Sequence, residues 1–511
     1  MKDEGAGVYN TLMSEDAEMN RSFQGPRAWF WGSVAGWTLL HILLAAQLPV
    51  SGDEAYYWDC ARHFDWAYFD QPGLMIWPIA FFRLILGDIS LAVRAPALMA
   101  SFIIAPMMLG LIRRLGGGYS RATVAYSLLH LMPLFFLGSL YESTDIGMAA
   151  AYIGATWAAV AVAQGDRRGW WGFGLAMGLG FLAKFPIVMA LPLILVALGR
   201  KEARDDLVTA TPWLAALMSL ALTAPVWIWA VSNNWDNIFF QGMRRMEGSG
   251  LTLKYLGEFL GAGLGLATPF LAIAIVLALW HFASKGQVDR WVVITASMIP
   301  FLVFGLISLR SRIGAHWGGP GMLIGAVILS LVAFKGRRWL IGSGAVFGLA
   351  ISLAIIGIVL VPEFLMDAEW SYAGRPKRFN TGELSRLVGN EEIGAELQRR
   401  LEPGEILLFT SYTDTHLFAF LSEGQLKTRL ASLADGKHGL ASLYWYESGD
   451  LIGKDALVVT PKGRLVRLLP IYCTEVEELE PVEIFRNDEV IRRLLLVRCR
   501  GVTRDQGAFA R

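Results

Sequence analysis

The stretch "WTLLHILLAAQLPVSGDEAYYWDC", residues 37–60, decides the fold class, because an apolar run is followed at once by carboxylates and aromatic side chains. A run of roughly 20 mainly apolar residues crosses a bilayer as a helix, and residues 28–48 form such a run. Tryptophan and tyrosine gather at membrane–water interfaces. The stretch therefore predicts a transmembrane helix that ends in an acidic, aromatic loop at one membrane face.

The composition of the whole chain agrees with a membrane protein. Of its 511 residues, 54% are hydrophobic and 17% are charged, whereas soluble domains carry about 25% charged residues. The net charge of +1 supplies no basic field for nucleic acid, so nucleic acid is excluded as a partner. We therefore expect an α-helical polytopic membrane protein.

Apolar windows of span length recur along the chain and predict about eleven transmembrane helices. They lie at residues 28–48, 89–112, 122–140, 145–163, 169–183, 185–199, 208–231, 257–282, 291–309, 314–334 and 339–361. Arginine and lysine fill the short loops on one side of these spans, which marks that side as cytoplasmic. The orientation predicts a cytoplasmic tail at 1–27, a transmembrane domain at 28–361, and a first outer loop at 49–88.

The region at residues 362–511 differs from the rest in composition. Runs such as "EILLFTSY" and "DALVVTP", flanked by turn residues, predict strands, and "GELSRLVGNEEIGAELQRRL" predicts a helix. We expect a soluble α/β domain here, on the side of the membrane opposite the cytoplasm. Cys473 and Cys499 both fall in it, and they would form a disulfide or remain as two buried thiols; the sequence leaves both open.

The first outer loop holds the residues best suited to chemistry. Asp53 and Glu54 follow the first span directly, and the aromatic side chains around them predict short helices lying on the outer membrane face. One interpretation is structural, with Asp53 capping a helix. The other is a carboxylate that serves as a general base or metal ligand.

A second carboxylate, Asp145, begins another predicted span on the same outer face. It too could be a helix cap. Several cations lie outside against the usual bias, namely Arg244, Arg245, Arg312, His316 and, beside a predicted helix break, Lys184. They would bind lipid headgroups or a substrate phosphate. Carboxylates, cations and aromatic rings above an apolar body suit a substrate with a lipid tail, a phosphate and a sugar.

The first outer loop, "GDEAYYWDCARHFDWAYFDQPGLMIW" (residues 52–77), resembles that of GT-C glycosyltransferases of the aminoarabinose-transferase and protein-mannosyltransferase type. The shared pattern is an acidic pair, then aromatic residues, then a tyrosine-aromatic-acid-x-proline element, here residues 68–72. "STDIGMAAAY" resembles the second acidic position of the family. "FFQGMRRMEGSG", "RSRIGAHWGGP" and the C-terminal "LLFTSYTDTHLFAFLSEG" fall where the family has later outer segments.

The resemblance implies roles for particular residues. Those expected in catalysis are Asp53, Glu54 and Asp145. Those that the resemblance implies in binding the donor or its phosphate are Tyr57, Tyr68 and either Arg244 or Arg245. Further candidates for the same binding, from their charge or their place in the outer segments, are Lys184, Arg312, Gln71 and His316. Asp70 matches a carboxylate that can bind a divalent metal ion, the one cofactor that the resemblance implies.

The chain departs from the aminoarabinose branch at three places. Gln71 stands where that branch has a lysine, residues 241–243 replace a histidine-rich stretch, and His316 replaces a tyrosine. The arginine pair is more like that of relatives that transfer uronic acids, which makes galacturonic acid a candidate sugar.

The function that the sequence predicts is that of an inverting glycosyltransferase. It would move a sugar from a polyprenyl-phosphate carrier, such as undecaprenyl phosphate, to lipid A, lipopolysaccharide core or another envelope acceptor. The expected location is the bacterial inner membrane, with the active site and the C-terminal domain in the periplasm and membrane lipids as neighbours. The alternatives are a transporter or flippase for a lipid-linked sugar and a membrane-anchored binding protein.

Overall fold

The computed structural model describes residues 27–504, except 243–249, 285–286, 333–337, 373–374, 379–381, 432–438 and 448. The predicted cytoplasmic tail lies almost wholly outside these residues. The chain divides into two compact units, each built from separate segments. The first unit comprises residues 1–44, 96–228 and 246–352, and the second comprises residues 45–95, 229–245 and 353–511.

Helices make up most of the chain before residue 368. They are α2 (Arg27–Gln47), α3 (Gly52–Arg62), α4 (Trp77–Leu86), α5 (Ser90–Arg114), α6 (Tyr119–Leu131), α7 (Pro133–Gly138), α8 (Thr144–Ala163), α9 (Arg168–Ala183), η1 (Phe185–Ala190), α10 (Leu191–Ala197), α11 (Lys201–Asp205), η2 (Asp206–Val208), α12 (Ala210–Leu222), α13 (Ala224–Ser232), α14 (Asp236–Gly242), α15 (Lys254–Ala267), α16 (Pro269–Ala283), α17 (Val288–Ser308), η4 (Ala315–Gly318), α18 (Gly319–Leu331), α19 (Arg338–Leu360) and α20 (Pro362–Asp367).

Each of the eleven predicted spans coincides with one of these helices or with two consecutive ones. Among the described residues, five helices are long and apolar enough to cross a membrane, or up to seven if each bent pair counts as one span. The polytopic helical class is therefore confirmed, while the number eleven stays a prediction.

Several windows expected to be continuous helices are broken, among them 208–231, which bends by 46° between α12 and α13. The window 257–282 is wrong as a single helix, because α15 and α16 meet at 97°. At the bend Thr268 has φ +66, and its hydroxyl accepts a hydrogen bond from the Leu271 N–H. The window 122–140 divides at Met132, which has an extended backbone before Pro133, as residues before proline prefer.

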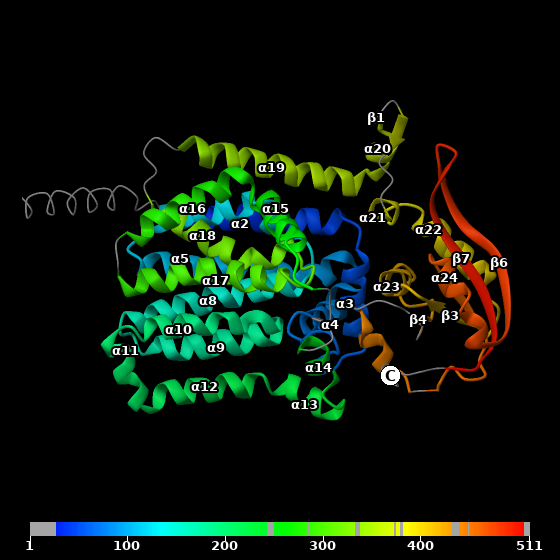
Figure 1. Ribbon diagram of the computed structural model, residues 1–511, viewed down its shortest axis with the longest axis horizontal. Coiled ribbons are helices and arrows are strands. Elements are labelled where there is room, and N and C mark those ends of the chain that lie inside the picture. The colour runs from blue at the N-terminus through cyan, green and yellow to red at the C-terminus, as the bar shows by residue number, and fades with distance from the viewer. Residues whose placement is uncertain are drawn as a thin grey trace, which may run out of the picture. The chain divides into compact units, whose positions relative to one another are not determined.

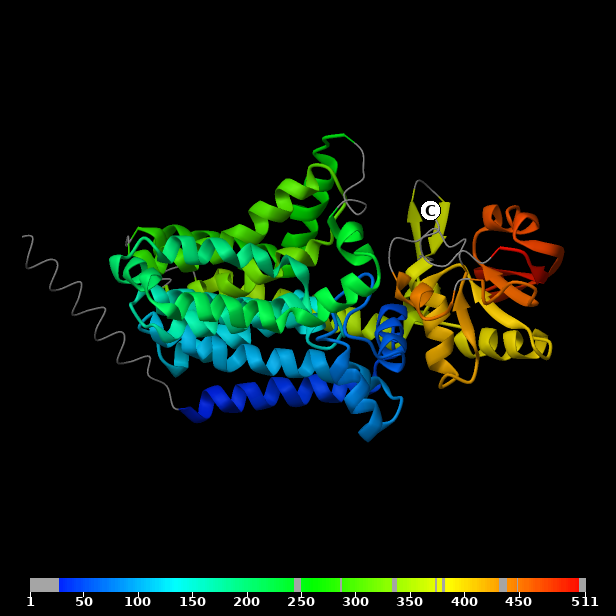
Figure 2. The same cartoon turned by 90° about the horizontal axis from the view of Figure 1, so that it is seen from below.

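The long helices of the first unit pack side by side. In Figures 1 and 2 α8, α9, α12 and α17 run with nearly parallel axes, and α8 contacts both α9 and α17. Small residues allow close approach between such helices. A Cβ placed on Gly174 of α9 would lie 2.3 Å from the carbonyl oxygen of Ala215 on α12. The sequence "GWWGFGLAMGLGFLA" of α9 thus fits a tightly packed bundle helix.

The C-terminal region of the second unit folds as a small α/β domain, as predicted. Its strands are β1 (Glu369–Tyr372), β2 (Arg375–Arg378), β3 (Ile406–Phe409), β4 (Thr428–Leu430), β5 (Ala456–Thr460), β6 (Cys473–Arg486) and β7 (Glu489–Val502). Its helices are α21 (Gly382–Ser385), α22 (Asn390–Arg400), α23 (Tyr412–Leu421), η5 (Leu440–Tyr444), α24 (Gly463–Val466) and η6 (Leu469–Ile471).

Five of these strands form one mixed sheet in the order β4-β3-β5-β7-β6. Strand β3 is parallel to β4 and β5, whereas β7 is antiparallel to β5 and β6. The burial of β5 is complete, as expected for a central strand of an α/β sheet. Strands β1 and β2 form a separate antiparallel pair.

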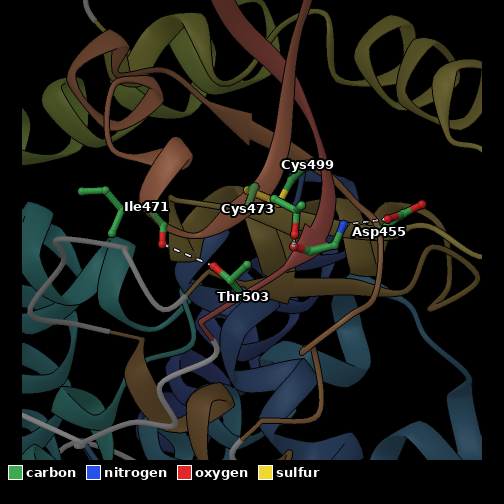
Figure 3. Close-up of a disulfide and its surroundings, with 7 residues drawn as sticks. Asp455, Ile471, Cys473, Cys499 and Thr503 are labelled. Atoms are coloured by element: carbon green, nitrogen blue, oxygen red, sulfur yellow. Dashed lines mark hydrogen bonds between the residues drawn. A yellow bond between two sulfur atoms is a disulfide. The ribbon is translucent and has the colours of Figure 1, made fainter.

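Cys473 and Cys499 form a disulfide between the ends of β6 and β7, with their Cα atoms 5.4 Å apart. Figure 3 shows the disulfide with nearby hydrogen bonds, among them the one that the Thr503 hydroxyl donates to the Ile471 carbonyl oxygen at 3.3 Å. Of the two alternatives that the sequence left open, the disulfide is the one observed. The third cysteine, Cys60, is free and buried.

Candidate active site

Helix α3 begins with a reciprocal cap. The Ser51 hydroxyl accepts a hydrogen bond from the Glu54 N–H at 3.2 Å, and the Ser51 N–H donates to Glu54 Oε2 at 3.0 Å. Such a capping box satisfies the first amides of a helix. The helix cap is therefore Ser51, and the interpretation in which Asp53 only caps the helix is wrong.

Glu54 is fully buried and ion-paired. Arg94, which is 3% exposed, donates to Glu54 Oε1 at 2.7 Å and to Oε2 at 2.8 Å. The same guanidinium donates to the carbonyl oxygens of Ala45, Leu48 and Pro49 at 2.8 Å each. It thereby ties the loop to the end of α2. These contacts are structural, and the catalytic role expected for Glu54 stays a prediction.

Asp53, the neighbouring carboxylate, meets the C-terminal domain. The Tyr412 hydroxyl donates to Asp53 Oδ1 at 2.6 Å. Burial is the largest cause that raises the pKa of Tyr412 well above its usual value, and the charge of the Asp53 carboxylate is the second. Tyr412 therefore stays a hydrogen-bond donor over the whole physiological range of pH.

Asp70 accepts hydrogen bonds from the first outer loop and from the C-terminal domain, both of which belong to the second unit. Its Oδ1 accepts from the Tyr56 hydroxyl at 2.5 Å and its Oδ2 from the Gly439 N–H at 2.8 Å. Burial is the largest cause that raises the pKa of Tyr56 well above its usual value, and the charge of Asp70 is the second. Both carboxylate oxygens of Asp70 thus accept protein hydrogen bonds.

The metal site that the sequence predicts is centred on Asp70. Among the described residues no three histidine, cysteine, aspartate or glutamate side chains cluster so that they could hold a metal ion. Asp70 is hydrogen-bonded to Tyr56 and Gly439, and its expected role in binding a divalent metal ion stays a prediction. No step below is routed through a metal.

Three more predicted site residues, Tyr57, Tyr68 and Gln71, belong to the first outer loop. Tyr68 is 2% exposed, and its hydroxyl donates to the Cys60 carbonyl at 2.9 Å, which fixes the fold of the loop. Tyr57 is partly buried, with its ring 5.8 Å from that of Tyr56. Gln71 is 8% exposed, and its side-chain nitrogen has no hydrogen-bond partner among the described residues. A buried amide of this kind calls for a water molecule or a ligand.

The second predicted carboxylate, Asp145, lies in the first turn of α8 in the first unit. Lys184 Nζ lies 2.7 Å from both of its oxygens, and His316 Nε2 lies 3.6 Å from Oδ2. Lys184 is the C-cap of α9, where the extended backbone before η1 ends the helix. The predicted break at this lysine is therefore real. It sets the ammonium group beside the start of α8.

A cavity of about 230 Å³ opens at this charged cluster. Asp145 and His316 line it together with apolar residues of α7, α8, α15 and α18, among them Leu134, Ile146 and Leu266. The lining is mainly apolar, with a carboxylate and an imidazole among it. The shape and chemistry suit a ligand with an apolar chain and an anionic head.

Of the three predicted phosphate-binding arginines, the structure describes one. Arg244 and Arg245 lie outside the described residues. Arg312 is described, and its Nε donates to Glu258 Oε2 at 2.9 Å. Because Asp53 belongs to the second compact unit and Asp145 to the first, the expected position of both on one outer membrane face stays a prediction.

Sequence reasoning missed three residues near the first loop. Arg94 was hidden because a lone arginine in a predicted span carries no pattern that points to Glu54. Tyr412 and His416 belong to the C-terminal domain, yet they contact Asp53 and Asp59 of α3. The only signal was their place in the C-terminal segment "LLFTSYTDTHLFAFLSEG", which resembles the same family.

Residues 70–229 match the family profile described as dolichyl-phosphate-mannose-protein mannosyltransferase. A comparison with curated proteins finds no match. ArnT from Cupriavidus metallidurans in the apo state is similar in structure, with a TM-score of 0.65 and 14% identity over 92% of this chain and 98% of that one. ArnT bound to undecaprenyl phosphate gives a TM-score of 0.64 and 14% identity, over 93% of this chain and 98% of that one.

A third similar structure is that of the arabinofuranosyltransferase AftD from Mycobacteria, with a TM-score of 0.50 and 12% identity. That match covers 94% of this chain and 40% of AftD. Identities this low establish likeness of fold. The chain therefore has the fold of GT-C glycosyltransferases and resembles ArnT, as the first outer loop predicted.

Proposed function

We propose that this chain is an inverting glycosyltransferase that moves a sugar from a polyprenyl-phosphate carrier to an acceptor in the cell envelope. The acceptor is lipid A or a related envelope glycan, and the reaction takes place on the periplasmic face of a bacterial inner membrane. The proposal extends to this chain the carrier class bound in the ArnT complex, which is undecaprenyl phosphate.

One observation carries the proposal. Asp145 and His316 line a mainly apolar cavity, and Lys184 is paired with Asp145. A polyprenyl phosphate is an apolar chain with an anionic head, so a mainly apolar cavity beside a cation suits it. Lys184 supplies a point charge to a phosphate.

The chemistry follows from the residue types. An acceptor oxygen attacks the anomeric carbon of the donor, and the bond from that carbon to the phosphate oxygen breaks. Asp53 takes the acceptor proton as general base. If the acceptor group is itself an ionised phosphate, Asp53 instead orients it. Polyprenyl phosphate leaves with its negative charge, which the cations stabilise as it develops.

The disulfide supports an extracytoplasmic position for the C-terminal domain. Disulfides persist in oxidising compartments such as the periplasm and are rare in the cytosol. The Cys473–Cys499 bond is therefore in keeping with the outer location that the loop charges predict for residues 362–511.

The test uses purified full-length protein in detergent with polyprenyl-phosphate sugars as donors and lipid A as acceptor. Transfer is expected without a sealed vesicle, whereas a flippase would need one. The Asp53→Asn variant should lose about 10²- to 10⁴-fold in rate, the usual contribution of a general base. Asp289→Asn changes another first-turn carboxylate, on α17, and should retain the wild-type rate.

The sugar and the acceptor are identified by mass spectrometry of envelope lipids from cells with and without the gene. The mass lost names the sugar, with galacturonic acid as the first candidate, and the molecule that loses it names the acceptor. Full transfer by Asp53→Asn would remove that residue's role. Transport across vesicles without transfer in detergent would replace the enzyme with a flippase.

A further inference from the structure

Two short helices of the second unit pack against each other. They are α3 from the first outer loop and α23 from the C-terminal domain. Residues 412, 416 and 420 recur every four positions, so their side chains share one side of α23. Tyr412 contacts Asp53, the His416 ring lies 4.9 Å from that of Tyr56, and the Phe420 ring lies 5.2 Å from that of Trp58.

The order of these contacts shows that the two helices run in the same direction. The start of α3 meets the start of α23, and their later residues meet in turn. The first turns are also very close, because a Cβ placed on Gly52 would lie 2.5 Å from Thr413 Cβ. Two helix N-termini therefore adjoin Asp53, and both favour a negative charge there.

A buried pair fixes the middle of this packing. His416 is fully buried, and its Nδ1 lies 2.9 Å from Asp59 Oδ2. Asp59 also accepts from Arg62 at 3.2 Å. This pair sets the register of α23 on α3, so that the first residue of α23 falls opposite the second residue of α3.

We propose that Tyr412 is a positioning residue for Asp53, so that the C-terminal domain completes the reaction centre of the transferase. The inference rests on the proposed function. The carboxylate of a short aspartate side chain rotates easily, and a hydrogen bond to Oδ1 fixes its orientation toward the acceptor.

The test compares Tyr412→Phe with wild type in the transfer assay. The variant keeps the ring and loses only the hydroxyl. We expect kcat to fall about tenfold to a hundredfold, the value of one hydrogen bond to a charged group, with the KM for the donor unchanged.

The matched control is Tyr444→Phe, which removes another hydroxyl bonded to a carboxylate of the same unit, Asp236 Oδ2 at 2.9 Å. It should leave kcat unchanged. In the Asp53→Asn background, Tyr412→Phe should cost nothing further, because it acts through Asp53.

Each outcome decides between the two proposals. Wild-type protein that transfers no sugar overturns the proposed function and this inference with it. Active wild type with an unaltered Tyr412→Phe overturns only the inference. An equal loss in both phenylalanine variants, accompanied by a lower unfolding temperature, assigns Tyr412 a purely structural role and also overturns it.

Discussion

The starts of α3 and α8 each carry a predicted active-site carboxylate, but the two are held by different kinds of group. Asp53 on α3 accepts from a tyrosine hydroxyl, whereas Asp145 on α8 is paired with a lysine ammonium. A carboxylate paired with an ammonium group fixes the position of that cation. Under the proposed function, Asp53 would act on the acceptor, and Asp145, through Lys184, would act on the donor phosphate.

A third carboxylate sharpens this comparison. Glu54 adjoins Asp53 in sequence, yet it is fully buried with Arg94. Adjacent acidic residues on one helix thus serve different ends. Glu54 builds the loop, and Asp53 faces the C-terminal domain.

The largest expected effect comes from breaking the buried pair. Arg94→Leu leaves Glu54 buried without its partner, which should destabilise the protein by about 3–5 kcal/mol. The yield of monodisperse protein and its unfolding temperature measure this. Adding Glu54→Leu should recover only part of the loss, because three carbonyl oxygens at the end of α2 still lack their donor. A stable single variant would show that Glu54 is not structural.

The second prediction concerns donor binding. Lys184→Ala should lower kcat/KM for the polyprenyl-phosphate sugar by about tenfold to a hundredfold, through loss of a charged contact to the phosphate. Asp145→Asn should add little in the Lys184→Ala background if Asp145 acts by orienting that lysine. Steady-state kinetics of the four proteins measures the coupling. Fully additive losses would mean that Asp145 has a separate role.

The smallest effect is one of pH on the contact between α3 and α23. Burial opposes ionisation of Asp59, but the hydrogen bond and charge of His416, together with the charges of His63 and Arg62, outweigh burial and hold the pKa of Asp59 below its usual value. The pair therefore stabilises the fold above the unfolded-state pKa of about 4. That contribution is lost as pH falls through the lower folded value.

Unfolding temperatures between pH 7 and pH 3 measure this effect in the wild type and in Asp59→Asn. The variant should be less stable at pH 7 and should lose less on acidification. Parallel curves for the two proteins would contradict the contribution of Asp59.

Much of the fold follows from the sequence because the bilayer imposes length and polarity on each helix. The apolar windows coincide with helices throughout, and Lys184 before Phe185-Pro186 marked a real break. The bend between α15 and α16 was missed, since a threonine at positive φ has no sequence signature. The sheet domain was recognised from its strand runs. Its disulfide stayed open because two distant cysteines carry no geometry.

The site was predictable where one segment supplies the residues and hidden where two segments meet. The loop around Asp53 and Asp70 was identified from local pattern alone. Its partner Tyr412 is 359 positions away from Asp53, and nothing in either segment names the other. Asp53 and Glu54 have different contacts because Arg94 lies against only one face of α3.

The packing of α3 on α23 also limits how such an enzyme can be rebuilt. A chimera that takes its C-terminal domain from a relative, in order to change the acceptor, must also import a tyrosine at position 412 and a residue that donates a hydrogen bond to Asp59. Exchange of the first outer loop and the C-terminal domain as a single cassette avoids that mismatch. Evolution faces the same constraint, so substitutions along these two helices should be inherited together.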